Sequence, residues 1–270
     1  MIKINGETQI IGFFGSTYKT SKMYAMYNAA FKALDLNYIY IPLVVNNLQK
    51  AVEGIRNLGI KGIGVTIPYK IEMIKYLDEL DENAKRVGAV NVVINNHGKL
   101  IGGNTDGLGA MKALEEVTNL KNKKVILLGS GGAARAIAFA VKDRDGKLII
   151  VNRTYKIARD LAHAVNCRFI KLDQLGKEIK EADILINATS VGMAPNIHES
   201  LVTKEYLRHK LAVMDLVTNP KETKLLKEAK EKGCKIVYGE RMLFWQSVLK
   251  FKIFTGAEPP VKVMEESLYA

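Results

Sequence analysis

Cysteine is scarce in this sequence, and long apolar runs are missing. Cys167 and Cys234 are the only cysteines, and they do not form a CxxC pair. We therefore expect no disulfide framework and no metal site, and a reducing compartment is favoured. No stretch approaches ~18 uncharged apolar residues, so no membrane span is predicted. Residues 1–6 lack the apolar run of a signal peptide, and the expected location is the cytoplasm.

Positive charge is in excess, with 40 Lys and Arg against 28 Asp and Glu, a net charge of +12. A basic protein can attract nucleic acid, an anionic membrane or small anions. The densest segment, residues 221–232, interleaves Glu with Lys at helical spacing, which is typical of a solvated helix face. No basic groove with aromatic platforms is visible, so a nucleic-acid partner is not predicted.

The length of 270 residues favours two domains over one large α/β domain. Strand-like and helix-like segments alternate along the first hundred residues, which predicts α/β architecture with a mostly parallel sheet. The expected strands are 8–14, 38–43, 64–67 and 90–94, and the expected helices are 22–35, 48–57 and 75–87, the last of them polar.

A second unit begins near Gly107 and keeps the same alternation, the pattern of a doubly wound fold. Its expected strands are 125–128, 148–151, 184–186, 212–216 and 235–238. Its expected helices are 108–117, 135–141, 157–165 and 225–232, followed by helices at 239–251 and 261–268.

Gly129-x-Gly131-x-x-Ala134 follows the buried strand 125–128 and precedes a helix. The first glycine permits a tight turn, the second lets the backbone approach a pyrophosphate, and the small third residue allows close helix packing. The helix N-terminus offers N–H groups and partial positive charge to the phosphates. The context predicts a dinucleotide site, against the alternative of a glycine-rich turn without a ligand.

The next strand ends at Asn152-Arg153-Thr154, where an NAD site usually carries Asp or Glu for the ribose hydroxyls. An arginine fork suits a 2′-phosphate. The sequence therefore favours NADP over NAD, unless Arg153 is an ordinary surface arginine.

Two short segments of the first domain carry side chains suited to proton transfer. Gly64 to Lys70 (GVTIPYK) places a lysine just after a strand, and Gly102 to Gly107 (GGNTDG) places Asp106 at the expected domain boundary. Clefts between domains are preferred sites for small ligands. A lysine and an aspartate that converge there could exchange a proton with a hydroxyl or ketone while hydride moves to a nicotinamide.

With these segments the whole chain resembles the shikimate dehydrogenase family. The matching motifs are GVTIPYK, GAVN at 88–91, GNTDG at 103–107, the 129–134 fingerprint, NRT at 152–154, NATSVGM at 187–193, G-x-x-ML-x-x-Q at 239–246 and TG at 255–256. The resemblance implies a substrate domain at 1–107 completed by 243–270, and an NADP-binding Rossmann domain at 108–242. It implies reversible, NADP-linked interconversion of 3-dehydroshikimate and shikimate.

The resemblance also implies roles for individual residues. Lys70 and Asp106 are the catalytic pair, and Ser21, Thr66, Asn91 and Gln246 bind the substrate. The implied cofactor-binding residues are Gly129, Gly131, Gly132, Ala133, Asn152, Arg153, Thr154, Thr189, Met193, Gly239 and Met242. For the methionines, ordinary core packing is the alternative.

Two positions depart from the family where it holds the substrate carboxylate. Met23 stands where the family has its second serine, and a thioether cannot donate a hydrogen bond. Thr218 stands where the family tends to have tyrosine. Lys19 or Lys22 could hold the carboxylate instead, the substrate could be quinate, an amino-shikimate or another hydroxylated ring acid, or Ser21 could simply cap the following helix.

The expected partner is thus a small shikimate-like acid. The competing functions are a paralogue with another substrate and a nucleotide-binding sensor without catalysis, and retention of both Lys70 and Asp106 speaks against the sensor. The oligomeric state is not determined by the sequence, which is compatible with a homodimer.

Overall fold

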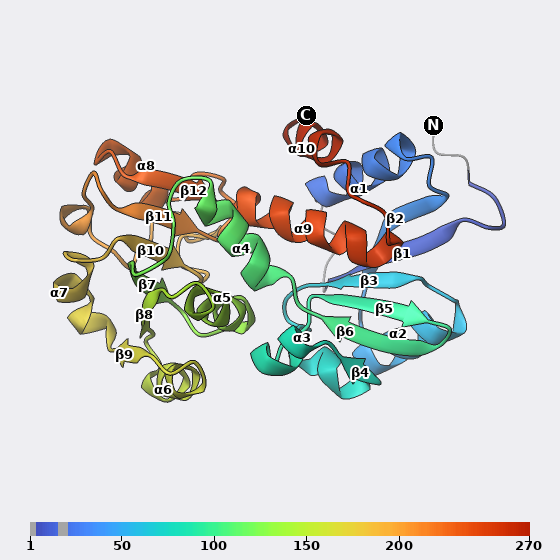
Figure 1. The fold of residues 1–270 in the computed structure, drawn as a ribbon, viewed down its shortest axis with the longest axis horizontal. Helices are drawn as coiled ribbons and strands as arrows, with labels where there is room; N and C mark the ends of the chain where they lie inside the picture. The colour runs from blue at the N-terminus through green and yellow to red at the C-terminus, as the bar shows by residue number, and fades with distance from the viewer. Residues whose placement is uncertain (1–3, 16–20) are drawn as a thin grey trace. The chain divides into compact units, whose positions relative to one another are not determined.

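A computed structural model describes residues 4–15 and 21–270 of the chain (Figure 1). The chain forms two compact units, unit 1 with Met1–Thr105 and Gln246–Ala270, and unit 2 with Asp106–Trp245. The expected boundaries were 107/108 and 242/243. In the structure the first boundary lies slightly earlier, at 105/106, and the second slightly later, at 245/246. Within the described ranges, no helix is long and apolar enough to cross a membrane.

Unit 2 is built on a six-stranded sheet with the order β12-β11-β10-β7-β8-β9, in which all neighbouring strands run parallel. Strand β7 (Lys124–Leu128), the first of this unit in the chain, lies in the middle of the sheet. The next two strands lie on one side of it and the last three on the other. Its run Val125–Leu128 is buried, as expected for a parallel strand covered on both faces. The predicted doubly wound Rossmann-type fold is confirmed.

The remaining elements of unit 2 follow the expected alternation, with strand β9 and helix α7 added. The strands are β8 (Lys147–Val151), β9 (Arg168–Ile170), β10 (Ile184–Asn187), β11 (Ala212–Asp215) and β12 (Lys235–Tyr238). The helices are α4 (Asp106–Glu115), α5 (Gly132–Lys142), α6 (Tyr155–Ala164), α7 (Leu175–Ile179) and α8 (Lys224–Glu231), with short 3-10 turns at Leu172–Gln174 and Lys204–Tyr206. Helix α8 buries Leu225, Leu226 and Ala229 and exposes its charged face, as its spacing predicts.

Unit 1 contains a six-stranded sheet with the order β2-β1-β3-β5-β6-β4. It is mixed, because β5 runs antiparallel to both β3 and β6, while β1 pairs in parallel with β2 and β3. The strands are β1 (Gln9–Gly15), β2 (Tyr38–Val44), β3 (Gly62–Val65), β4 (Glu79–Leu80), β5 (Val92–Asn96) and β6 (Lys99–Gly103).

The helices of unit 1 are α1 (Lys22–Ala33), α2 (Leu48–Asn57), α3 (Glu82–Val87) and α10 (Val261–Tyr269), with a 3-10 turn at Glu72–Tyr76. Helix α10 packs against α1 (Figure 1). Helix α9 (Gly239–Thr255) begins in unit 2, and its residues from Gln246 onward belong to unit 1.

A cluster of aromatic side chains holds the second half of α9 in unit 1. Tyr27 of α1 stacks on Tyr40 of β2 with ring centroids 4.3 Å apart, and Phe31 stacks on Phe251 at 5.5 Å. Phe254 is also buried, and its ring lies where a Cβ at Gly62 would sit. Burial of each such ring contributes ~1.5–3 kcal/mol, so the return of α9 is part of the core of unit 1.

The polar helix expected over 75–87 is wrong. Asp78 accepts a hydrogen bond from the Leu100 N–H at 2.6 Å, and the next two residues pair with β6 as strand β4. Asp81 then caps α3 by accepting from the Ala84 N–H at 2.6 Å. Sheet pairing and an N-cap therefore divide one apparent helical pattern into a turn, a strand and a short helix.

Strand β6 was not predicted, and Gly102 and Gly103 were placed only in the segment at the expected domain boundary. Both glycines are strand residues at which a Cβ would collide, with Leu77 at 2.5 Å and with Asp81 at 2.6 Å respectively. Glycine lowers strand propensity, but at these two positions it lets neighbouring side chains approach closely without having to shift.

Candidate active site

Thr66, Asn91 and Gln246, three of the predicted substrate residues, belong to one edge of the unit 1 sheet. Thr66 follows the carboxyl end of β3, and Asn91 precedes β5, which runs the other way. The Val65 N–H donates to the Asn91 carbonyl at 2.8 Å, and the Asn91 N–H donates to the Gly103 carbonyl at 3.0 Å. Since β5 is antiparallel to β3 and β6, its beginning lies beside their ends. Polar residues next to these three strand ends therefore share one edge of the sheet.

Asn91 is the centre of a buried hydrogen-bond network at this edge. Its Oδ1 accepts from the Thr105 N–H at 2.9 Å, and its Nδ2 donates to Thr105 Oγ1 at 3.0 Å and to Gln246 Oε1 at 3.0 Å. Thr105 Oγ1 also donates to the Gln246 carbonyl at 3.2 Å. The structure therefore brings Asn91 and Gln246 together, with Thr105 between them.

Lys70 lies in the turn that follows Thr66. Its carbonyl accepts from the Val90 N–H at 2.7 Å, and the Tyr69 hydroxyl donates to the Val45 carbonyl at 2.8 Å, so backbone and side-chain bonds on both sides hold the turn. The Lys70 side chain is partly exposed. Asp106 is buried, is the first residue of α4 and follows Thr105 directly, but it belongs to unit 2.

Ser21 is the N-cap of α1, and its Oγ accepts from the Met23 N–H at 3.3 Å, which confirms the capping interpretation. Met23 is buried, and its sulfur accepts from Ser247 Oγ at 3.6 Å. The Lys22 ammonium lies 5.9 Å from the ring centroid of Tyr269 in α10. Lys19, the other candidate for a carboxylate contact, lies outside the described residues.

The glycine loop of unit 2 fits a dinucleotide. Gly129 has φ +105, a conformation that favours glycine, and a Cβ there would lie 3.1 Å from the Ala188 carbonyl oxygen. Gly131 is the N-cap of α5 and provides no side-chain cap, so the first N–H groups of the helix, from Gly132 and Ala133 onward, face a site for phosphate. Helix α5 starts three residues before the sequence pattern indicated.

Ser130 adds a second sign of a ligand at this loop. It is 7% exposed, and its Oγ has no hydrogen-bond partner in the described part of the chain. A buried hydroxyl without a partner is destabilising by ~1–3 kcal/mol unless something binds it. The glycines, the uncapped helix and this hydroxyl together fit the diphosphate of a dinucleotide.

The segment after β8 is exposed. The Arg153 side chain has no charge or hydrogen-bond partner among residues 4–15 and 21–270, and Thr154 is the N-cap of α6 but makes no side-chain cap bond. The Thr154 N–H donates weakly to Asn152 Oδ1 at 3.4 Å. A guanidinium and a hydroxyl that make no internal bonds are available for an anionic ligand at this end of the sheet.

The remaining predicted cofactor-binding residues lie at the other side of the same edge. Thr189 follows β10, and its Oγ1 donates to Asn187 Oδ1 at 2.6 Å. Met193 is 46% exposed, whereas Met242 is buried in the first turns of α9. Gly239 begins α9, and a Cβ there would lie 2.6 Å from the Leu216 carbonyl oxygen, which excludes any other residue.

Three further polar residues of the two edges were not predicted as site residues, although two of them, Thr105 and Asn187, lie in motifs of the family resemblance. Thr105, Asn187 and Asp215 are buried, and each forms side-chain hydrogen bonds beside the predicted sites. Burial raises the pKa of the Asp215 carboxyl, although three donors oppose that shift. A polar residue at the end of a buried strand was the signal that could have found Asn187 and Asp215.

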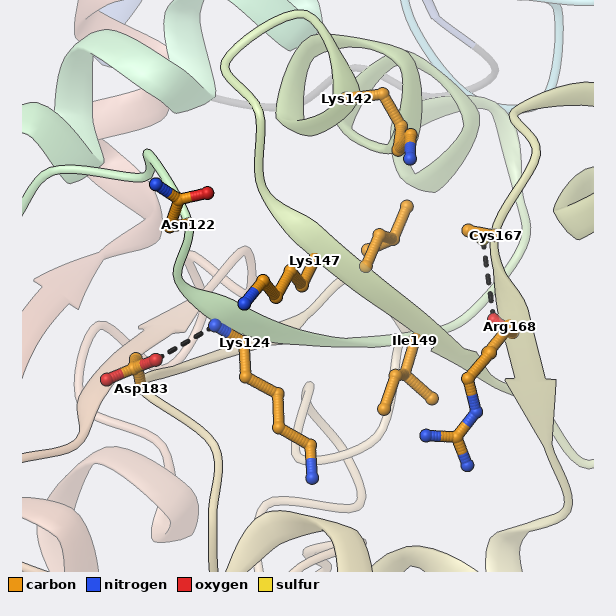
Figure 2. Close-up of a pocket in the computed structure, with 9 residues that line it drawn as sticks. Asn122, Lys124, Lys142, Lys147, Ile149, Cys167, Arg168 and Asp183 are labelled. Atoms are coloured by element: carbon orange, nitrogen blue, oxygen red, sulfur yellow. Dashed lines mark hydrogen bonds between the residues drawn. The ribbon is translucent and has the colours of Figure 1, made fainter.

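A cavity of about 560 Å³ lies at the opposite, amino edge of the unit 2 sheet (Figure 2). Lys124 and Lys147 begin β7 and β8 there. The Lys124 ammonium is paired with Glu178 at 2.8 Å, and the backbone N–H of Lys124 donates to the Asp183 carboxylate at 2.8 Å. Ligands of doubly wound sheets bind outside the carboxyl ends of the strands, so this cavity is not the dinucleotide site.

The fold and the two sites define the class of protein: a two-domain α/β oxidoreductase that uses a nicotinamide dinucleotide. Residues 13–93 match the shikimate dehydrogenase substrate binding domain, 111–230 match shikimate / quinate 5-dehydrogenase, and 239–269 match the shikimate 5′-dehydrogenase C-terminal domain. The chain belongs to the shikimate dehydrogenase family.

Relatives cover nearly the whole chain. A shikimate dehydrogenase (NADP(+)) from Methanocaldococcus jannaschii is 45% identical over 98% of this chain and 98% of its own length. A crystal structure of a shikimate dehydrogenase in complex with NADP+ has a TM-score of 0.92 at 45% identity and covers 99% of this chain and 96% of the other. A shikimate 5-dehydrogenase from Thermus thermophilus, solved with NADP(H) and shikimate, has a TM-score of 0.89 at 33% identity and covers 97% and 98%.

Proposed function

We propose that this chain is an NADP-dependent enzyme that reversibly reduces 3-dehydroshikimate to shikimate. The prediction of an oxidoreductase with NADP as cofactor is confirmed by the relatives, which carry the name shikimate dehydrogenase (NADP(+)) over nearly the full length. The observation that carries the proposal is the polar edge of unit 1, where Asn91 bonds Gln246, the Val65 N–H beside Thr66 bonds the Asn91 carbonyl, and the Val90 N–H bonds the Lys70 carbonyl.

The reaction divides into a hydride and a proton. Bound NADP supplies the hydride acceptor in one direction, and NADPH supplies the donor in the other. In the oxidation direction the ring hydroxyl loses its proton to Lys70 Nζ as its carbon becomes a ketone, and in reduction the ammonium returns that proton to the carbonyl oxygen. Asp106 is the proposed second member of this pair, which stabilises the charged lysine.

The remaining residues of the edge would hold the ring. Thr66, Asn91 and Gln246 offer both hydrogen-bond donors and acceptors, which suits a substrate with several hydroxyls. The bond between Asn91 and Gln246 orients both amides before substrate arrives, so little side-chain freedom is lost on binding. Ser21 is the proposed contact for the acid end of the substrate.

The proposed cofactor site follows the carboxyl edge of unit 2. Gly129, Gly131, Gly132 and Ala133 would hold the diphosphate, and Asn152, Arg153 and Thr154 the 2′-phosphate. Thr189, Met193, Gly239 and Met242 would surround the nicotinamide. Arg153 supports NADP over NAD, because its guanidinium is exposed at the end of β8 with no acid beside it in the sequence.

The direct test is an assay with shikimate and NADP, read as absorbance of the reduced cofactor, with NAD in parallel. The expected result is turnover with NADP that exceeds turnover with NAD. A panel of hydroxylated cyclohexane and cyclohexene acids, including quinate, measures the specificity. If no member of the panel is oxidised, the proposed function is wrong.

A related ring acid is the second candidate, because two positions of the acid-binding end differ from the family. Met23 is buried with its sulfur on Ser247, and Thr218 is exposed beyond β11. If shikimate binds poorly, Met23→Ser combined with Thr218→Tyr should lower its KM more than it changes kcat, since the acid group lies away from the reacting carbon. If Lys22 supplies the contact, Lys22→Ala should raise KM and the double change should do little.

We also propose that the enzyme works in the cytoplasm and assembles as a homodimer. Cys167 and Cys234 are both free thiols, which supports a reducing compartment. Light scattering of the purified chain measures the assembly directly, and a monomeric mass would overturn the dimer.

A further inference from the structure

Asp215 is the last residue of β11 in unit 2, and it is fully buried. Its Oδ1 accepts from Asn187 Nδ2 at 3.0 Å and from the Val217 N–H at 3.1 Å. Its Oδ2 accepts from Thr223 Oγ1 at 2.7 Å. Three donors from three different segments thus converge on one carboxylate.

The first segment is the loop after β10. Asn187 Nδ2 also donates to the Val191 carbonyl at 3.3 Å, while Asn187 Oδ1 accepts from the Thr189 N–H at 3.1 Å and from Thr189 Oγ1 at 2.6 Å. The Val191 N–H in turn donates to Thr189 Oγ1 at 3.2 Å. Asp215 therefore fixes the amide that shapes residues 188–191.

The second and third segments are the chain after β11 and the start of α8. The Val217 N–H fixes the first turn of residues 216–220, and the Asn219 carbonyl accepts from the Ala194 N–H at 3.0 Å, which joins this segment to the loop after β10. Thr223 is the N-cap of α8 and accepts from the Leu226 N–H at 3.3 Å. One carboxylate thus links two loops and a helix at the carboxyl edge of the sheet.

The strand order shows which part of a dinucleotide meets these loops. Strands β8 and β9 lie on one side of β7, and β10, β11 and β12 lie on the other. With the diphosphate at the start of α5 and the 2′-phosphate at Arg153 after β8, the nicotinamide half extends over the ends of β10 and β11.

We propose that Asp215 is a positioning residue for the nicotinamide half of the cofactor: it holds the loops after β10 and β11 in the shape that receives the ring. This inference rests on the NADP-dependent function proposed above. Asp215 acts through Asn187, Val217 and Thr223 and does not itself touch the ring. All three of its partners donate, so an acceptor-only carboxylate satisfies them where most other side chains cannot.

The amide variant Asp215→Asn separates shape from charge. One orientation of the amide keeps an oxygen for Asn187 and Val217 and directs its NH₂ to the Thr223 hydroxyl, which can accept. Asp215→Asn should therefore retain most of the loop shape, whereas Asp215→Ala removes all three bonds. Asn187→Ala is the second variant, since it leaves β11 intact and cuts only the connection to the loop after β10.

Asp183 provides a matched control. It precedes β10 at the amino edge of the sheet, and its carboxylate accepts from the Lys124 N–H at 2.8 Å. Asp183→Ala also removes a carboxylate that accepts from a backbone N–H, that of Lys124, but it does so at the edge of the sheet opposite the loops that Asp215 holds.

The experiment compares affinities for NADP and for 2′-phospho-ADP-ribose, a fragment that lacks nicotinamide, in the full-length chain. In Asp215→Ala and Asn187→Ala we expect fragment affinity within about twofold of the parent, a weaker NADP affinity, and a kcat lower by roughly 10–100-fold from misplacement of the ring. Asp215→Asn should recover most of both losses, and Asp183→Ala should leave the ratio of the two affinities at the parental value.

Two results would overturn the inference. Equal weakening of NADP and fragment in the variants would show that Asp215 supports the whole domain, and an unchanged ratio with parental kcat would show that it positions nothing. Asn187→Ala decides the question if Asp215→Ala does not fold. Failure of the proposed function is separate, because it appears in the parent as no turnover of shikimate while the two affinities remain measurable.

Discussion

The two sheet edges form their sites in different ways. In unit 2 the phosphate site consists mainly of backbone: Gly129 with φ +105, the uncapped start of α5 after Gly131, and the small buried Ala134. In unit 1 the polar edge consists of side chains, with Asn91 bonded to Thr105 and to Gln246.

The difference lies in how far apart the partners are in the sequence. The glycine loop needs about six consecutive residues, whereas Asn91 and Gln246 are 155 positions apart. A backbone site tolerates changes at its other side chains, while a side-chain network loses a buried partner with each substitution. The two units should therefore respond differently to single changes, and the following predictions test that.

Lys70→Ala should have the largest effect. Loss of a positioned acid–base group lowers kcat by ~10²–10⁴ and leaves NADP binding almost unchanged, since Lys70 belongs to unit 1. Asp106→Asn should act in the same direction. Steady-state kinetics with a cofactor titration measures both, and Lys75→Ala, an exposed lysine a few residues on, is the control. Near-parental turnover by Lys70→Ala would refute the proposed proton transfer.

Arg153→Ala should weaken NADP binding and spare NAD. A charge-assisted contact of ~1.5–3 kcal/mol corresponds to a roughly 10–150-fold loss of affinity. Isothermal titration with both cofactors provides the comparison. Arg159→Ala is the matched control, because that arginine lies in the neighbouring helix α6 and pairs with Asp160 at 3.1 Å. Equal weakening of the two cofactors would mean that Arg153 is structural.

Asn91→Ala should destabilise unit 1 and also raise KM for shikimate. The buried Thr105 N–H loses its acceptor, which lowers the free energy of unfolding by ~1–3 kcal/mol. Asn28→Ala serves as control, since Asn28 bonds both backbone groups of Tyr40 but lies away from the site. Denaturant unfolding should show a loss of stability in both variants and kinetics a raised KM only in Asn91→Ala. A parental KM in Asn91→Ala would remove Asn91 from the substrate site.

Ser130→Ala should have the smallest effect and the most specific one. A neutral hydrogen bond of ~0.5–1.5 kcal/mol corresponds to a loss of NADP affinity of about 2–13-fold. Stability without cofactor should not fall, because Ser130 Oγ has no partner within the described residues. Ser200→Ala should do the reverse, since Ser200 Oγ donates to the Val202 carbonyl at 2.8 Å. Unchanged NADP affinity in Ser130→Ala would show that the hydroxyl does not meet the diphosphate.

Local patterns predicted much of the fold and part of the candidate site. The run Val125–Leu128 and the fingerprint after it predicted a Rossmann-type unit, because strand, turn and helix follow one another directly. The expected helix over 75–87 was wrong, since pairing of Glu79 and Leu80 with β6 overrides a helical pattern. Strand β6 was missed because glycine is a poor strand former, although the Leu77 and Asp81 side chains pack where a Cβ at Gly102 and Gly103 would lie.

The sequence by itself determined the α/β class, the glycine loop and the position of Arg153, because each depends on neighbours in the chain. Only the tertiary structure decided that Thr105 belongs with Asn91 and Gln246, that Met23 is buried on Ser247, and that Asp215 joins three segments. A hydrogen bond requires two groups within about 3 Å. Only strand order and helix packing bring residues that are far apart in the chain within hydrogen-bond distance of each other.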